Sequence, residues 1–167
     1  VQNGHTVFIE TNAGKAAHFS DNEYSEQGGT IVFTPEEVYQ SDVIIKITPP
    51  TIEEIDKMKN RQTIISALHL PIQDQIYFKK LISKRIAALS YEFIKDKIGT
   101  FPVVRAMSEI AGNTSMLIAA EHLSNSVYGK GRMLGGISGI TPTEVVIIGA
   151  GTVGEFAARA AMGLRAL

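Results

Sequence analysis

The run Glu144-Val-Val-Ile-Ile148 leads directly into Gly149-Ala-Gly-Thr-Val-Gly154, and this stretch decides how the chain is interpreted. The apolar run predicts a buried strand, and the alanines that follow Gly154 predict a helix. In such a turn the first glycine permits a tight bend, the second lets a pyrophosphate approach the backbone, and the third lets helix and strand pack closely. The helix N-terminus also offers backbone N–H groups to phosphates. The pattern predicts a dinucleotide-binding turn, with a glycine-rich turn that binds no ligand as the alternative.

The glycines expected at the cofactor are Gly149, Gly151 and Gly154. In dinucleotide-binding folds an acidic residue about 20 positions further on distinguishes NAD from NADP. That position falls after Leu167, so the turn alone predicts the class of cofactor and not which of the two binds.

Upstream of the turn, short apolar runs alternate with helical stretches. The expected strands are 5–10, 30–33, 42–47, 62–68 and 86–91, and the longest helical stretch is 107–123. The spacings Ser20-Asp-Asn-Glu23 and Thr51-Ile-Glu-Glu54 are typical of capping boxes and predict helix starts. Strands that alternate with helices predict an α/β fold, a doubly wound parallel sheet with helices on both faces.

The composition changes at Ser124–Thr143, where five glycines fall close together. A long segment without periodicity is unusual inside one compact domain, so we place a domain boundary there. The expected organisation is a first domain over 1–125, a glycine-rich interdomain segment over 126–143, and the beginning of a Rossmann dinucleotide-binding domain over 144–167.

The 167 residues carry a net charge of −1, and no Lys/Arg cluster forms a basic stripe. This argues against nucleic-acid and membrane-surface partners, which need a concentrated positive field. The absence of cysteine excludes disulfides and cysteine nucleophiles, and it suits a reducing cytoplasm. No apolar run reaches the roughly 18 residues of a membrane span. The chain begins with Val1 rather than Met, so we expect a piece of a longer protein.

Two residues at strand ends are the candidates for chemistry. Lys46 interrupts the apolar run Val43–Ile47, and His69 follows the next expected strand. Open α/β sheets bind ligands at the carboxyl ends of their strands, so a cation and an imidazole are expected to face one cleft there. The alternatives are a strand-end lysine that reaches water and a histidine that caps a helix or fills the core. No histidine has metal-ligand spacing, and no metal site is expected.

Five motifs resemble the alanine dehydrogenases in order and spacing. They are Ile44-Ile-Lys-Ile-Thr-Pro-Pro50, Ala67-Leu-His-Leu70, Met107-Ser-Glu-Ile-Ala-Gly112, Gly131-Arg-Met-Leu-Gly-Gly-Ile-Ser-Gly139 and Val145-Val-Ile-Ile-Gly-Ala-Gly-Thr-Val-Gly154. The resemblance extends over nearly the whole chain. The alpha subunit of proton-translocating nicotinamide nucleotide transhydrogenase shares the architecture, but it usually has a Gln in the region of Glu109, which favours the dehydrogenase.

The resemblance implies an NAD-dependent oxidoreductase that converts L-alanine reversibly to pyruvate and ammonia. By this carry-over Lys46 binds and polarises the substrate's oxygen atoms, and His69 is the acid/base beside the reacting carbon. Ser108 resembles a residue that contacts the cofactor from the first domain, with a helix-start serine as the alternative. Thr152 and Val153 would hold the pyrophosphate together with the glycines. The resemblance also implies a cytoplasmic homo-hexamer.

Two other functions are open at this point. One is an NAD(H)-binding alpha subunit of a proton-translocating transhydrogenase, and the other is a non-catalytic, flavodoxin-like interaction module. The chain also departs from the family in three ways. It lacks the family's first strand, which carries a substrate-gripping arginine, it lacks a catalytic aspartate of the second domain, and it has Arg165 where the family usually has glycine. We therefore expect the 167-residue piece alone to be inactive.

Overall fold

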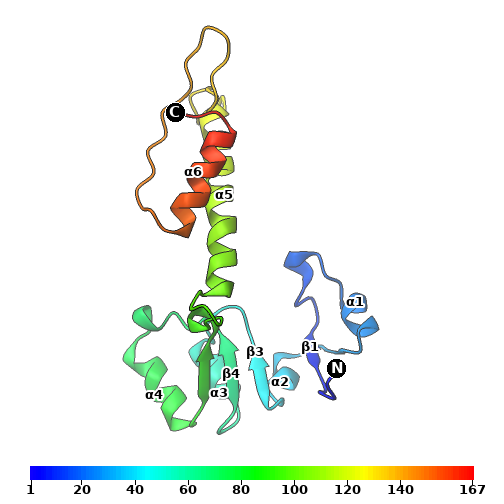
Figure 1. The fold of residues 1–167 in the computed structure, drawn as a ribbon. Helices are drawn as coiled ribbons and strands as arrows, with labels where there is room; N and C mark the ends of the chain where they lie inside the picture. The colour runs from blue at the N-terminus through cyan, green and yellow to red at the C-terminus, as the bar shows by residue number, and fades with distance from the viewer. The chain divides into compact units, whose positions relative to one another are not determined.

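The computed structural model describes all of residues 1–167, which fall into two compact units. The N-terminal unit is Val1–Glu92 and the C-terminal unit is Phe93–Leu167 (Figure 1). Every strand pairing in the N-terminal unit is parallel, and helices connect the strands. The α/β class that the alternating pattern predicts is confirmed.

The strands of the N-terminal unit form two parallel sheets. The pairs are β1 (Phe8–Glu10) with β2 (Thr30–Val32), and β3 (Val43–Ile45), β4 (Thr63–Ser66) and β5 (Ala87–Ser90) in that order. All five coincide with apolar runs that predict strands. Parallel strands end at the same edge of a sheet, so the residues that follow β3, β4 and β5 are brought to one edge.

Short helices connect these strands. They are α1 (Asp21–Glu26), α2 (Pro35–Val38), α3 (Ile52–Lys57) and α4 (Gln75–Ser83), with 3-10 turns η1 (Lys15–Ala17), η2 (Leu70–Ile72) and η3 (Tyr91–Phe93). The capping boxes predicted at α1 and α3 are both present, because Ser20 and Thr51 exchange hydrogen bonds with Glu23 and Glu54. These caps satisfy backbone N–H groups that would otherwise lack partners.

One face of the three-stranded sheet forms the core of this unit. Ile44 and Ile64 are buried on it, and Ile55 of α3 packs with Tyr77 and Leu81 of α4 in a second buried cluster. Successive strand side chains point to opposite faces. The opposite face carries Val43, Ile45 and Leu89, which are at least half exposed. Within Val1–Glu92, therefore, the buried core lies on the face of this sheet that carries Ile44 and Ile64.

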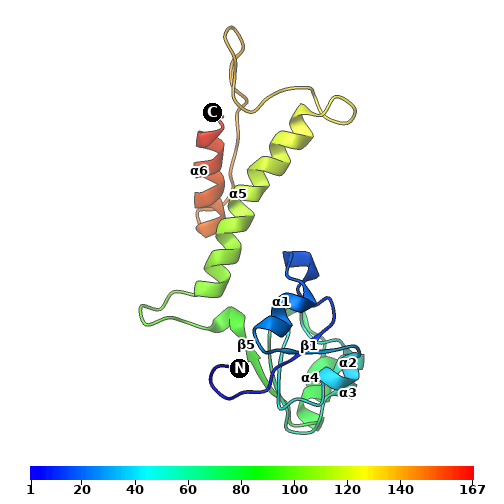
Figure 2. The ribbon, with the colours of Figure 1, turned by 90° about the vertical axis from the view of Figure 1, so that its right-hand side faces the viewer.

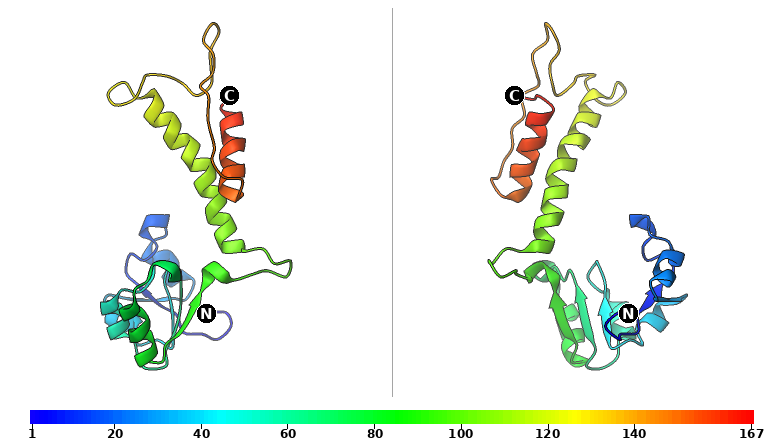
Figure 3. Two further views of the ribbon diagram at one scale, coloured as in Figure 1. Left: turned by 90° about the vertical axis from the view of Figure 1, so that its left-hand side faces the viewer. Right: turned by 45° about the vertical axis from the view of Figure 1, so that its right-hand side comes forward.

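The C-terminal unit is built from two helices, α5 (Pro102–Ser124) and α6 (Thr152–Gly163), which lie side by side (Figures 2 and 3). A side chain on Gly112 would meet the Val153 carbonyl oxygen at 2.5 Å, so a glycine is needed where the helices touch. Met116, Leu134, Ala157 and Ala161 form the buried core of the unit. No helix of the chain combines the length and the apolarity needed to cross a membrane.

The strand predicted at Glu144–Ile148 is absent, which corrects the sequence analysis. A strand needs a continuous ladder of hydrogen bonds to a neighbour. Here the Val145 N–H donates to the Leu167 carbonyl at 2.7 Å, and the Leu167 N–H donates to the Thr143 carbonyl at 3.0 Å. This is one step of a parallel ladder, and no second strand lies beside the rest of the segment.

The predicted boundary at 126–143 and the division between Glu92 and Phe93 fall at different places. The reason is that α5 packs on α6, which joins the two sides of the glycine-rich segment into one unit. Within that segment a single antiparallel bridge pairs Ile137 with Ile140. The domain organisation over 1–125, 126–143 and 144–167 stays a prediction.

Candidate functional site

The glycine turn before α6 has a different reason for glycine at each of its three positions. Gly149 has φ +119°, a conformation that L side chains rarely adopt. A side chain on Gly154 would meet the Gly149 carbonyl oxygen at 2.1 Å. At Gly151, in contrast, a Cβ would meet no atom within 4 Å. The fold therefore requires the first and third glycines, whereas the second one keeps open a space that the chain itself does not fill.

The same turn presents the N-terminus of α6. Gly151 is the N-cap, and no side chain accepts a hydrogen bond from the first turn there. The first hydrogen bond into the helix joins the Glu155 N–H to the Gly151 carbonyl at 2.9 Å. The N–H groups of Thr152, Val153 and Gly154 precede it, and such groups together with the helix dipole favour an anion.

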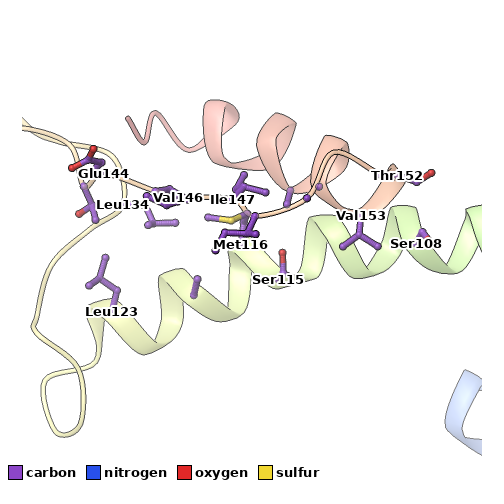
Figure 4. Close-up of a pocket in the computed structure, with 18 residues that line it drawn as sticks. Ser108, Ser115, Met116, Leu123, Leu134, Glu144, Val146, Ile147, Thr152 and Val153 are labelled. Carbon is purple, nitrogen blue, oxygen red and sulfur yellow. The ribbon is translucent and has the colours of Figure 1, made fainter. Parts of the chain in front are cut away.

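A pocket of about 690 Å³ connects this turn with α5 inside the C-terminal unit. Ser108 and Ser115 of α5 line it together with the glycine turn, Thr152 and Val153. Figure 4 shows Ser108, Thr152 and Val153 gathered at one end of the pocket, and Leu123 and Leu134 at the other. Ser108 lies in the second turn of α5 and not at its cap, which is Phe101. The alternative of a helix-start serine is therefore wrong.

Lys46 directly follows β3, at the edge where the three strands end. Its ammonium group donates to the Thr48 hydroxyl at 2.6 Å and lies 3.4 Å from Glu54 Oε1. The other oxygen of Glu54 accepts the Thr51 N–H at 2.7 Å, so one carboxylate both caps α3 and holds the lysine. The lysine is three-quarters buried as a side chain, at 27% exposure, and does not simply extend into water.

His69 follows β4 at the same edge, because β3 and β4 pair with Ile45 opposite Ile65. Its backbone is left-handed, with φ 46°, which is uncommon for a residue with a Cβ. The side chain is 51% exposed, and it makes no cap hydrogen bond to the following turn η2. Neither alternative from the sequence, a core histidine or a capping histidine, describes it.

The sequence analysis missed Glu92, which lies just after β5 at this edge. Glu92 Oε1 is 3.0 Å from His69 Nδ1, and Glu92 Oε2 accepts the N–H groups of Leu68 and His69 at 3.0 Å each. The His69 N–H is the main reason that the pKa of Glu92 is lowered, with Ser90, Leu68 and the histidine ring adding to it. A signal was available, since an acid after a third parallel strand faces the same edge as Lys46 and His69.

The carboxyl edge of the sheet thus carries two side-chain pairs, Lys46 with Glu54 and His69 with Glu92, which we call the strand-end site. It offers one ammonium group for an anionic or carbonyl oxygen and one oriented imidazole for proton transfer. Nowhere in the structure do three or more His, Asp or Glu side chains gather in a manner that could hold a metal ion.

Comparison with known protein families matches both parts of the chain. Residues 1–111 match the alanine dehydrogenase/PNT N-terminal domain, and residues 115–167 match the corresponding C-terminal domain. Among curated proteins, an alanine dehydrogenase of Methanococcus maripaludis is 38% identical over 98% of the chain. One from Mycolicibacterium smegmatis is 36% identical, again over 98% of the chain. The chain spans only 44% of the length of each.

Solved structures give the same result for the fold. An L-alanine dehydrogenase superposes with a TM-score of 0.90 at 35% identity, covering 99% of this chain and 45% of that one. A transhydrogenase from Sinorhizobium meliloti superposes with a TM-score of 0.80 at 20% identity, covering 99% and 49%. At that identity the second likeness concerns the fold alone.

Proposed function

The chain belongs to the alanine dehydrogenase/PNT family, and on that premise we propose that it is part of an NAD-dependent alanine dehydrogenase. The reaction is the reversible oxidative deamination of L-alanine to pyruvate and ammonia. The observation that carries the proposal is the glycine turn, where the fold requires Gly149 and Gly154 but leaves the space at Gly151 open. The substrate follows the relatives, which are named alanine dehydrogenases at 36–38% identity.

The residues of the turn fit a dinucleotide. Gly151 leaves room for a pyrophosphate beside the backbone, and the N-terminus of α6 directs its first N–H groups there. Ser108 lines the same pocket and would add a hydroxyl donor. We assign cofactor binding to Gly149, Gly151, Thr152, Val153, Gly154 and Ser108. When bound, NAD accepts the hydride from the Cα of alanine.

The strand-end site would supply the remaining steps. Lys46 pairs its ammonium group with the carboxylate of alanine or the carbonyl oxygen of pyruvate, and so stabilises charge on that oxygen. His69 takes the proton from the water that adds to the oxidised substrate, and it returns a proton in the reverse direction. Glu54 and Thr48 hold the lysine head group near the strand end. These roles of Lys46 and His69 are part of the proposal.

The test uses the complete protein with L-alanine and NAD. Production of NADH that depends on alanine, with pyruvate formed in equal amount, is the expected result. Other small amino acids in place of alanine measure the specificity. The absence of turnover with every amino acid would overturn the proposal.

The second candidate is an NAD(H)-binding transhydrogenase subunit, because the matching family is described as alanine dehydrogenase/PNT and not as alanine dehydrogenase alone. Its activity would appear as hydride transfer between NADH and an NADP analogue without alanine. The alanine dehydrogenase proposal also includes assembly into homo-hexamers and a cytoplasmic location, and light scattering of the complete protein tests the assembly.

A further inference from the structure

The carboxylate of Glu92 is held by four contacts that divide between its two oxygens. Oε2 accepts the backbone N–H groups of Leu68 and His69 at 3.0 Å each, and the Ser90 hydroxyl at 2.8 Å. Oε1 has a different neighbour, the Nδ1 atom of His69 at 3.0 Å. One oxygen therefore fixes the turn after β4, and the other one faces the imidazole ring.

These contacts decide which nitrogen of His69 carries the proton. The backbone N–H of His69, more than any other group, lowers the pKa of Glu92, so its carboxyl group is ionised at neutral pH. An ionised carboxylate can only accept hydrogen bonds. Nδ1 must therefore be the donor, and in the neutral ring the lone pair is on Nε2.

We propose that Glu92 is a positioning residue that holds His69 as the Nδ1–H tautomer and leaves Nε2 to exchange the proton of the reaction. This inference rests on the proposed acid/base function of His69. The proton moves between Nε2 and the substrate water, while the Nδ1–H stays beside Glu92 Oε1 and the carboxylate keeps its charge. Ser90 anchors the carboxylate to the end of β5, so the orientation of the ring is tied to the sheet edge.

A purely structural role would be different: Glu92 could matter only because it caps the backbone at Leu68 and His69. The variant Glu92→Gln separates these roles. Three donors converge on the Oε2 position, so the amide oxygen of glutamine is placed there and the turn is kept. The amide NH₂ then faces Nδ1 and donates to it, which requires a lone pair on Nδ1 and moves the proton to Nε2.

The experiment compares the unsubstituted complete protein with Glu92→Gln and with Glu26→Gln, which removes the same charge from the exposed end of α1. For Glu92→Gln we expect kcat to fall by at least about a hundredfold, within the range for a lost acid/base group, while NADH affinity stays the same. The melting temperature should change little, because the turn keeps its hydrogen bonds. Glu26→Gln should change none of these quantities.

A second readout reports the tautomer without any need for activity. Diethylpyrocarbonate acylates the imidazole nitrogen that has a free lone pair, and peptide mass spectrometry gives the rate at each histidine. In Glu92→Gln the lone pair turns toward the amide, so acylation of His69 should slow by about tenfold, whereas His5 and His18 react as before. Unchanged acylation of His69, or unchanged kcat in a folded variant, would overturn the inference.

The unsubstituted protein provides a test that does not depend on the folding of any variant. With ¹⁵N-labelled histidine, the nitrogen shifts of His69 distinguish Nδ1–H from Nε2–H. The Nε2–H form would disprove the role of Glu92. If the complete protein failed to oxidise alanine, the proposed function would fall, while the acylation and nitrogen-shift results would still decide the tautomer.

Discussion

The glycine turn at Gly149–Gly154 and the strand-end site at Lys46 and His69 are built in different ways. The turn is made of backbone, and the features that require glycine at Gly149 and Gly154 arise within a few residues along the chain. The strand-end site is made of side chains, and His69 meets its partner Glu92 across 23 positions of sequence. A backbone site is sensitive to added atoms, whereas a side-chain site is sensitive to lost functional groups.

The largest effect is expected from the loss of the imidazole. In the complete protein, His69→Ala should lower kcat by about a hundredfold to ten-thousandfold, the usual range for a general acid/base. Binding of NADH should persist, because the glycine turn and not the imidazole holds the phosphates. Steady-state kinetics together with NADH titration measures both quantities.

His18→Ala is the matched control for that substitution. His18 is an exposed histidine of the same unit and also has a left-handed backbone, with φ 62°. It should leave kcat unchanged. Near-normal turnover in a folded His69→Ala protein would remove His69 from the mechanism and leave the turn as the only supported site.

A smaller effect is expected from the loss of the ammonium group. Lys46→Ala should weaken pyruvate binding by roughly ten- to a hundredfold, as expected when a hydrogen bond to a charged group is lost. It should also lower kcat, since a substrate oxygen would remain unpaired. Lys57→Ala removes an exposed lysine that pairs with Glu36 and should change neither quantity. A lysine that only neutralises Glu54 would give equal kinetics in the two variants.

The turn should respond in the opposite way, through added atoms. Gly154→Ala places a Cβ 2.1 Å from the Gly149 carbonyl oxygen, so it should cost about 1–3 kcal/mol of stability as overpacking does, and cofactor binding with it. The Cβ of Gly151→Ala would meet no atom within 4 Å, so the melting temperature should stay the same. NADH affinity should fall by about tenfold or more, which corresponds to a loss of about 1.4 kcal/mol in binding free energy. Thermal melting and NADH titration separate the two. Unchanged affinity in Gly151→Ala would show that the open space is not used by the cofactor.

The same contrast explains how much the sequence could predict. The glycine spacing and the capping boxes at Ser20 and Thr51 act over three to five positions, and the structure has all of them. The strand predicted at Glu144–Ile148 is absent, and its own residues could not show this, because a ladder needs a partner strand. The pattern at Glu54 predicts only a capping box, and its contact with Lys46 appears only when β3 and α3 are folded together.

The smallest effect is expected at Arg165, which has a left-handed backbone conformation that glycine usually adopts. Arg165 follows α6 with φ 59°, its N–H donates to the Met162 carbonyl, and the Ala166 N–H donates to the Ala161 carbonyl. This pair of hydrogen bonds is the Schellman motif, whose left-handed residue is usually glycine. The resemblance to the alanine dehydrogenases likewise leads us to expect glycine there. The departure at Arg165 is therefore a matter of backbone strain, since its side chain has no ion-pair partner in the structure.

Arg165→Gly should raise the stability of the complete protein by about 0.5–1 kcal/mol, because relief of the left-handed strain exceeds the added freedom of the unfolded chain. Arg85→Gly, after α4, tests the same geometry in the N-terminal unit, where Arg85 has φ 53° and the same two hydrogen bonds. Gly28→Ala, after α1, is the reverse test at φ 86° and should destabilise. Denaturant unfolding measures all three. Destabilisation by Arg165→Gly together with stabilisation by Arg85→Gly would contradict the strain argument at Arg165. The arginine side chain would then contribute to stability at the end of α6, as side chains do at the strand-end site.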